Sequence, residues 1–205
     1  NLSVAAEWAN ETLQIKQCAW TDNTGNFAGR ASWNVRTKAA DFQSHSTLDA
    51  KRLLDAAGFP LLADVTLNSP PLLELSGSAD FATDKPKISM IGRIDVEHFS
   101  YKTVPLLKLT ADFSWDGERT MIRELRLRHE SGELRGALLD APDDFRLNVE
   151  SAIDPIVFRA FASPELGRFL AEWEWSRPPA IRLAIRGPGR NPETWLGDGS
   201  ITTQR

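Results

Sequence analysis

Apolar and polar residues alternate along most of the chain, which is the pattern of β-strands with one buried and one solvated face. The clearest run covers residues 107–115, where leucine, alanine, phenylalanine and tryptophan occupy every second position. A slip in phase between Ile15 and Cys18 predicts a β-bulge in the second strand. Further alternating runs cover residues 2–8, 27–35, 73–81, 88–96 and 181–185. The pattern therefore predicts a mainly β protein.

Two stretches interrupt the alternation with helical signals. Asp49 is placed to cap a helix over about 49–58, because apolar residues follow at helical spacing and Gly58 and Pro60 end the pattern. Asp154 and Pro155 form a second start signal, and Ser163–Pro164 repeats it. We therefore expect a helical segment over about 154–171, formed by one helix or by two short ones.

The second half of the chain resembles the first. Residues 61–71 and 169–179 align without a gap, and both end in Pro-Pro. Further matches keep the same order: Leu2, Val4, Ala6 and Trp8 with Leu109, Ala111, Phe113 and Trp115; Gly25 and Gly29 with Gly132 and Gly136; Ser46–Asp49 with Ser151–Asp154; Gly92 and Ile94 with Gly199 and Ile201. This predicts two tandem β-repeats, 1–105 and 106–205, each with about seven antiparallel strands and a short helical segment.

Short turns between successive strands indicate an antiparallel sheet. Laid flat, about fourteen strands would extend over roughly 65 Å, far more than two short helices can cover. The apolar face therefore needs another partner. Two alternatives follow: the sheet closes into a sandwich or barrel, or it forms a curved, taco-like groove whose apolar lining meets a ligand.

Composition narrows the class of protein further. The chain has 205 residues, a net charge of −4 and 41% hydrophobic residues, which is ordinary for a soluble domain and unlike a nucleic-acid surface. A single cysteine, Cys18, excludes an intramolecular disulfide. No apolar run approaches the ~20 residues of a membrane span. Because the chain starts at Asn1, we expect it to be an internal piece of a longer protein.

Candidate chemistry is sparse, and the sequence predicts no catalytic, cofactor-binding or metal-binding residues. His45, His98 and His129 are far apart in the chain, and Asp140, Asp143 and Asp144 lack the spacing of a calcium loop. Asp198, between two glycines, is expected in a turn. The seven tryptophans suit a core better than a sugar site, and a hydrolase or lyase is the least favoured class.

The alternating strands, the Ile153-Asp-Pro155 helix start and the Pro-Pro run that leads to Gly187 resemble the AsmA-like superfamily of Gram-negative envelope proteins, which includes the TamB and YhdP types and is similar to bridge-like lipid-transfer proteins. The resemblance implies a β-groove in the periplasm that carries phospholipid between the inner and outer membranes. It also implies an inner-membrane anchor outside this sequence and possible envelope protein partners.

Alternation assigns the expected groove lining to one face and charged residues to the other. An acyl chain on that face would need no cofactor and no specific polar contact. The alternatives are a closed core of the same residues and a compact β-sandwich that binds carbohydrate or protein. The expected lining is Leu73, Leu75, Phe81, Met90, Val96, Leu107, Leu109, Phe113, Trp115, Phe145, Leu147, Trp173, Trp175, Leu183 and Ile185; the opposite face holds Lys108, Asp112, Arg146, Glu172, Glu174, Arg182 and Arg186.

Overall fold

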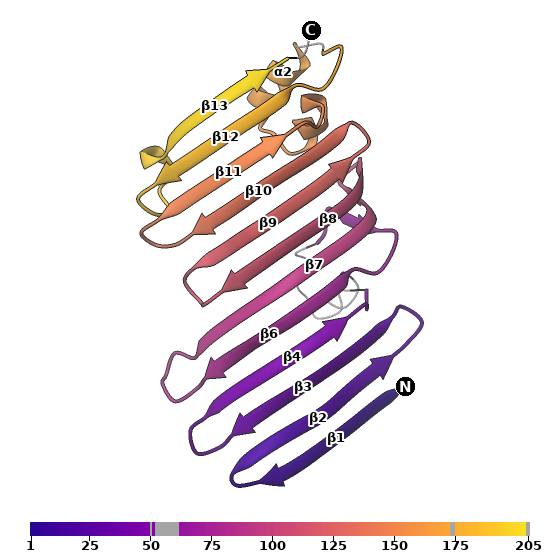
Figure 1. Cartoon of the computed structure of the whole chain (residues 1–205), viewed down its shortest axis with the longest axis vertical. Coiled ribbons are helices and arrows are strands. Elements are labelled where there is room, and N and C mark those ends of the chain that lie inside the picture. Colours follow the sequence, from indigo (N-terminus) through magenta and orange to yellow (C-terminus); the bar gives the residue numbers. More distant parts are fainter. Residues whose placement is uncertain (50, 52–61, 173–174, 204–205) are drawn as a thin grey trace.

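The computed structural model describes residues 1–205 except 50, 52–61, 173–174 and 204–205. Within the described residues the chain forms one open, curved antiparallel sheet of 13 strands (Figure 1). The strands are β1 (Leu2–Ala9), β2 (Thr12–Thr21), β3 (Asn26–Asn34), β4 (Ala39–Ser46), β5 (Val65–Leu67), β6 (Leu72–Asp80), β7 (Lys87–Tyr101), β8 (Val104–Trp115), β9 (Thr120–His129), β10 (Gly132–Asp140), β11 (Phe145–Ser151), β12 (Ala180–Gly187) and β13 (Leu196–Thr202).

The strand order follows the sequence from β1 at one end of the sheet to β13 at the other, with only β5 off this path. β5 instead pairs with the far end of β7, where Val65 lies opposite Tyr101. Residues 62–64 form a turn that precedes β5. Asp198 was expected in a turn, and this expectation is wrong: Asp198 lies inside β13, opposite Ala184.

Strand pairing divides the side chains between two faces, since residues directly opposite each other in an antiparallel pair point the same way. One continuous row, for example, joins Trp33, Ala40, Ala79 and Ile88 across four strands. We call the face that carries such rows the apolar face. Its members are Leu2, Val4, Ala6, Trp8, Leu13, Ile15, Cys18, Trp20, Phe27, Ala31, Trp33, Ala40, Phe42, Leu73, Leu75, Ala79, Ile88, Met90, Ile94, Val96, Leu109, Ala111, Phe113, Trp115, Ile122, Leu125, Leu127, Leu134, Leu138, Phe145, Leu147, Val149, Ile181, Leu183, Ile185 and Ile201.

The best-packed part of the described chain lies where β7 and β8 meet β5. Val96, Phe99 and Leu106 are buried there, and Val65 and Leu67 pack against them. His98 has a positive φ of 48°, which interrupts the alternation along β7. Phe99 can therefore join Val96 in the same cluster although the two are three residues apart. Opposite Phe99, β8 contributes Leu106 to the cluster.

The helical segment predicted over 154–171 forms two short elements, η1 (Pro155–Ala160) and α2 (Pro164–Ala171). The Asp154 carboxylate caps η1 by accepting a hydrogen bond from the Ile156 N–H at 3.0 Å, as the sequence predicted. Phe161 then stacks on Tyr101 of β7 with ring centroids 4.7 Å apart, so this segment covers the cluster end of the sheet. A third short element, η2 (Pro192–Thr194), precedes β13. Most of the helix expected over 49–58 lies outside the described residues.

The bulge predicted before Cys18 is confirmed, and the same irregularity occurs 107 residues later. On β2 the register shift leaves Lys16 without an opposite residue on β1. On β9 the corresponding shift leaves Arg123 without one on β8. On its other side, each bulged strand pairs with a strand that carries a glycine on the apolar face. Gly29 of β3 pairs with Cys18, and Gly136 of β10 pairs with Leu125.

Two glycines before β3 and β10 occupy matching positions. A β-carbon on Gly25 would lie 2.1 Å from the Thr47 carbonyl oxygen, and one on Gly132 would lie 2.1 Å from that of Ala152. Neither site can hold a larger residue without movement of the backbone. Each contact is followed by a buried aliphatic residue, Leu48 or Ile153. Gly25 and Gly132 are 107 residues apart, and Leu48 and Ile153 are 105 residues apart. These are offsets on which the predicted repeat rests.

The open sheet leaves much of its surface in solvent. The chain has a solvent-accessible surface of 13,792 Å², whereas a compact protein of its 22.8 kDa is expected to expose about 9,600 Å². The expectation of a sheet that stays curved and open is thus confirmed, and the alternative of a closed sandwich or barrel is wrong. The long runs of half-buried residues reflect contacts along one sheet, with no second sheet among the described residues.

Candidate functional site

Most of the predicted lining residues lie on the apolar face. Strand pairing brings Leu75, Phe113 and Met90 into adjacent rows of β6, β8 and β7. Phe81 follows β6 and contacts Trp33 edge to face at 5.4 Å between ring centroids, which places it beside the same face. Strand pairing also places these predicted residues on the apolar face: Leu73, Val96, Leu109, Trp115, Phe145, Leu147, Leu183 and Ile185.

Three predicted lining residues do not fit as expected. Leu107 lies opposite the irregular His98, and Leu106 rather than Leu107 is buried in the core cluster. Trp175 was expected on a strand, but it follows α2 in a segment without strand structure. Trp173 lies outside the described residues. The helix α2 extends to Ala171. The strand that the alternating sequence predicted from residue 169 onward therefore does not form at its start.

The apolar face is wider than the predicted lining. Strands β1–β4 contribute Trp8, Ile15, Phe27 and Phe42, and β9 and β10 contribute Leu127 and Leu134 among others. Their alternation was visible in the sequence, but the rows across neighbouring strands only became evident from the register. The face thus has apolar members on every described strand except β5, although Ser44, Ser46 and Thr120 also lie on it.

Solvent reaches this face most freely at the two ends of the sheet. Leu2, Trp8 and Ile201 are 71%, 59% and 58% exposed, and Leu183 is 37% exposed. At the β12 turn the Trp195 ring stacks on Phe145 at 3.8 Å and donates from Nε1 to the Gly189 carbonyl at 2.8 Å. This aromatic pair covers one margin of the face next to Gly187. Between the margins, side chains such as Leu75, Met90 and Phe113 are only half-buried by the described residues.

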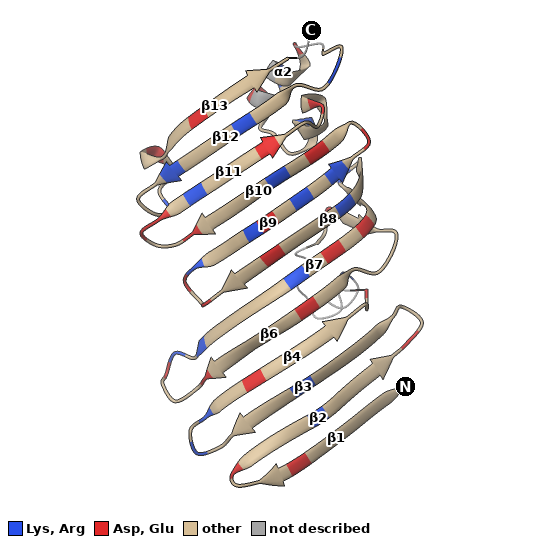
Figure 2. Ribbon diagram, viewed as in Figure 1, with Lys and Arg blue, Asp and Glu red and all other residues tan. Residues whose placement is uncertain are grey.

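The polar face carries charges of both signs on neighbouring strands (Figure 2). Many are paired: Lys108 lies 3.1 Å from Asp95 and 2.8 Å from Glu97, and Arg182 lies 3.3 Å from Glu150. As predicted, Lys108, Asp112, Arg146, Arg182 and Arg186 lie on this side. Glu172 follows α2 in a turn, and Glu174 is outside the described residues.

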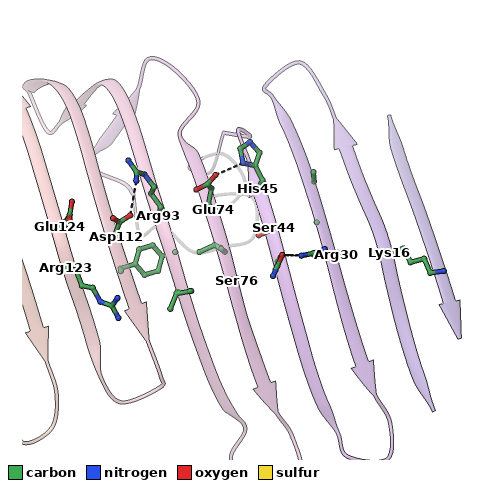
Figure 3. Close-up of a pocket in the computed structure, with 17 residues that line it drawn as sticks. Lys16, Arg30, Ser44, His45, Glu74, Ser76, Arg93, Asp112, Arg123 and Glu124 are labelled. Atoms are coloured by element: carbon green, nitrogen blue, oxygen red, sulfur yellow. Dashed lines mark hydrogen bonds and ion pairs between the residues drawn. The ribbon is translucent and has the colours of Figure 1, made fainter. Parts of the chain in front are cut away.

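A pocket of about 890 Å³ opens between rows of side chains on the polar face, from β2 to β9. Figure 3 shows Arg93 directed toward Asp112 and His45 toward Glu74, at 3.9 and 3.5 Å. Arg30 donates two hydrogen bonds to the Gln43 side-chain oxygen. The pocket is open to solvent, and the charged pairs Arg93–Asp112 and His45–Glu74 lie within its lining. Apart from the polar phase of the strands, no pattern in the sequence indicated this pocket.

Most of the resolved pKa shifts arise from ion pairs at the surface, whereas backbone hydrogen bonds from Arg119 and Glu118 lower the pKa of Asp116. The hydrogen bond from Lys108 lowers the pKa of Glu97, and the bond to Glu97 raises the pKa of Lys108, with Asp95 adding to it. A hydrogen bond from Arg135 similarly lowers the pKa of Glu133. These shifts stabilise the ordinary charged forms of the side chains. They do not create a neutral acid or a free base of the kind that acid–base catalysis uses.

The histidine and aspartates considered for metal binding make structural contacts. His129 accepts a hydrogen bond through Nδ1 from the Ser131 N–H at 3.1 Å. Asp140 binds Arg190 at 2.7 Å, and Asp144 binds Arg146 at 2.8 Å. In the part of the chain that the structure describes, no three His, Cys, Asp or Glu side chains come together as metal ligands. None of the described helices is long and apolar enough to cross a bilayer.

Comparison of the chain with protein-family models, curated proteins and solved structures finds no match. The functional interpretation therefore rests on the geometry of the two faces.

Proposed function

We propose that this chain is a non-enzymatic, lipid-binding β-sheet whose apolar face holds the acyl chains of phospholipid. One observation carries the proposal: apolar side chains of this face occur on all described strands except β5, and none of the described elements forms a layer over its middle. Large exposed apolar surfaces on soluble proteins usually bind a partner or a ligand. An acyl chain is the ligand that matches a long face without converging polar groups.

The energetics of such binding are favourable without any specific contact. Burying one methylene is worth roughly 0.8 kcal/mol, so ten methylenes laid on the face contribute about 8 kcal/mol before ordering costs. Side chains such as Leu75, Met90 and Phe113 can contact any methylene along the acyl chain. Adjacent rows offer similar surfaces, so a bound lipid can shift from row to row. This property suits lipid transfer better than tight storage.

We further propose that the two halves are tandem copies of one unit within an AsmA-like envelope protein. The supporting observations are the recurring bulges at Lys16 and Arg123 and the matching glycines Gly25 and Gly132. In such a protein the face would conduct phospholipid across the periplasm between inner and outer membrane. The anchor in the inner membrane and any envelope protein partners would be supplied by other parts of that protein.

The alternative of a compact β-sandwich for carbohydrate or protein is not favoured, because its premise was a closed core and the described strands form a single open sheet. Several charged residues of the polar face are paired with one another, among them Arg93 with Asp112, Lys108 with Glu97, and Arg182 with Glu150. Binding through an apolar face remains the function that fits the geometry best.

Two neighbouring residues on opposite faces of β12 test the proposal. Leu183 is exposed on the apolar face, and Ala184 is exposed on the polar face. We expect Leu183→Asp to weaken binding of a fluorescent phospholipid about tenfold, because the carboxylate must be desolvated beside the acyl chain. Ala184→Asp should leave binding unchanged. Circular dichroism would show whether both variants keep the β-sheet. Equal binding by both folded variants, or no binding by the unmodified protein, would contradict the proposal.

A further inference from the structure

Two neighbouring turns form a basic margin beside the apolar face. The turn from β3 to β4 covers residues 35–38, and the turn from β6 to β7 covers residues 81–86. The two turns touch, because the Phe81 N–H donates a hydrogen bond to the Lys38 carbonyl at 2.9 Å. Figure 2 shows Lys or Arg residues at both turns. We call these two turns the basic margin.

Apolar side chains of the basic margin are open to solvent. Phe81, whose ring packs on Trp33 of the apolar face, is 38% exposed, and Val35, two residues beyond Trp33, is 48% exposed. Exposed aromatic and aliphatic side chains beside cations are typical of protein segments that lie where hydrocarbon meets lipid headgroups. The basic margin therefore has the composition expected at the boundary between the acyl chain and the headgroup of a phospholipid.

Two lysines of the basic margin are available to an anion. Arg36 lies 3.2 Å from Glu11, whereas Lys38 and Lys85 are exposed and form no ion pair with a described residue. Asp84 is the single acidic residue in the two turns. The margin is thus locally positive on a chain whose net charge is −4. Such a site attracts a phosphate group more strongly than the rest of the surface does.

The far end of the neighbouring strand β7 is closed. Along β7 the apolar face leads from Ile88, next to the basic margin, to Val96 in the buried cluster. Val96 and Phe99 are only 5% and 7% exposed, and Phe161 stacks on Tyr101 beyond them. A headgroup placed there would lose its hydration without gaining a polar partner in the cluster. A phospholipid along β7 therefore has one favourable direction.

The distance between the basic margin and the buried cluster fits an acyl chain. Ile88 and Val96 are eight residues apart on β7, which corresponds to about 27 Å at ~3.4 Å per residue. An acyl chain spans about half of the ~30 Å hydrocarbon core of a bilayer, or about 15 Å. A chain that begins at the margin would end near Gly92, before the face reaches the cluster.

From these observations we propose that a bound phospholipid lies along β6 and β7 with its headgroup at the basic margin, and that anionic phospholipids bind more tightly than zwitterionic ones. This inference rests on the proposed lipid-binding function and adds the polarity and the headgroup class of the ligand. The ammonium groups of Lys38 and Lys85 attract the lipid phosphate. Phosphatidylcholine carries its own cation beside the phosphate, which competes with the lysines, whereas phosphatidylglycerol carries none.

Binding of fluorescent phosphatidylglycerol and phosphatidylcholine with identical acyl chains tests the headgroup class. We expect the unmodified protein to bind phosphatidylglycerol about tenfold more tightly, and Lys38→Glu/Lys85→Glu to lose this preference. Arg126→Glu/Arg186→Glu is the control with the same change in net charge. Both arginines are exposed on the polar face, each directly opposite another arginine, and their replacement should leave the preference intact.

The possible failures of this experiment differ in meaning. Equal affinity of the unmodified protein for both lipids, or the same loss of preference in both double variants, would overturn the role of the basic margin while leaving lipid binding intact. Failure of the unmodified protein to bind either lipid would overturn the proposed function and this inference together.

Photolabelling tests the polarity in the unmodified protein, so the result does not depend on the folding of a variant. A phospholipid with a photoreactive headgroup should label peptides that contain residues 35–38 and 81–86. A phospholipid with the photoreactive group at the end of its acyl chain should label residues around Gly92 and Phe113. Labelling of the basic margin by both probes equally, or of the buried cluster by the headgroup probe, would overturn the proposed polarity.

Discussion

Gly92 of β7 lies directly beneath the ring of Phe113 on β8. A β-carbon on Gly92 would be 2.6 Å from that ring, 2.7 Å from the Leu75 side chain and 2.9 Å from the Glu74 carbonyl oxygen. The glycine therefore allows an aromatic and an aliphatic side chain to meet over the backbone at the junction of the two halves. At the matching Gly199 a β-carbon would meet Arg182 at 3.2 Å and Leu183 at 3.7 Å.

This difference predicts unequal costs for the same substitution. Gly92→Ala should lower the free energy of unfolding by about 1–3 kcal/mol, because the added methyl group displaces two packed side chains. Gly199→Ala should change it by less than about 1 kcal/mol, since reduced freedom of the unfolded chain offsets the mild crowding. Urea unfolding followed by circular dichroism measures both. Similar values for the two variants would show that the close packing at Gly92 is absent.

Gly25 and Gly132 provide a test of the tandem repeat. Alanine at either position would place a methyl group 2.1 Å from a backbone carbonyl oxygen, which the backbone can relieve only by moving. We expect Gly25→Ala and Gly132→Ala each to destabilise the protein by more than about 2 kcal/mol. Gly197→Ala, which meets no atom within 4 Å, is the control. A tolerated substitution at only one of the pair would argue against equivalent sites.

Truncation of apolar side chains should have very different effects along the sheet. Leu106 is 4% exposed in the cluster of β7 and β8, whereas Val4 is 56% exposed on β1. Leu106→Ala should cost about 2–5 kcal/mol, as for other buried leucines, and Val4→Ala less than about 1 kcal/mol. Denaturant unfolding would measure both. Equal losses would mean that another layer buries the apolar face in solution.

The ion pair of Lys108 with Glu97 predicts a small acid sensitivity. Because Lys108 holds the pKa of Glu97 below its ordinary value of 4.5, the pair contributes stability above that pH, and the contribution is lost as the pH falls through the lowered pKa. Lys108→Met should return the pKa of Glu97 toward 4.5. Titration of the carboxyl carbon by NMR detects the change. Lys87→Met, at the opposite end of β7, is the control and should leave the Glu97 titration where it is.

Local patterns in the sequence predicted much of this fold. The phase slip before Cys18 is a bulge, Asp154 caps a short helix, and alternation assigned residues such as Leu75 and Leu183 to one face. These features depend on neighbours within a few residues. The open sheet and the rows of side chains across it depend on pairing between distant residues, and alternation alone could not exclude a closed sandwich.

The misplaced residues have specific physical causes. Leu107 was assigned by alternation, but the positive φ of His98 opposite it changes the phase, and Leu106 is buried instead. Trp175 was assigned to a strand because Trp173 and Trp175 alternate with glutamates, yet α2 extends to Ala171 and leaves Trp175 outside any strand. A positive φ at a residue other than glycine has little sequence signal.

The most direct test of lipid binding is a map of where a phospholipid with a photoreactive group at the end of its acyl chain attaches to the protein. Adducts would be located by mass spectrometry of proteolytic peptides. We expect them on apolar-face residues of several strands, such as Leu75, Phe113 and Leu183, and not on polar-face residues such as Ser76 and Ala184. Adducts spread equally over both faces, or none above the level of a water-soluble photoreactive probe, would contradict a lipid-binding apolar face.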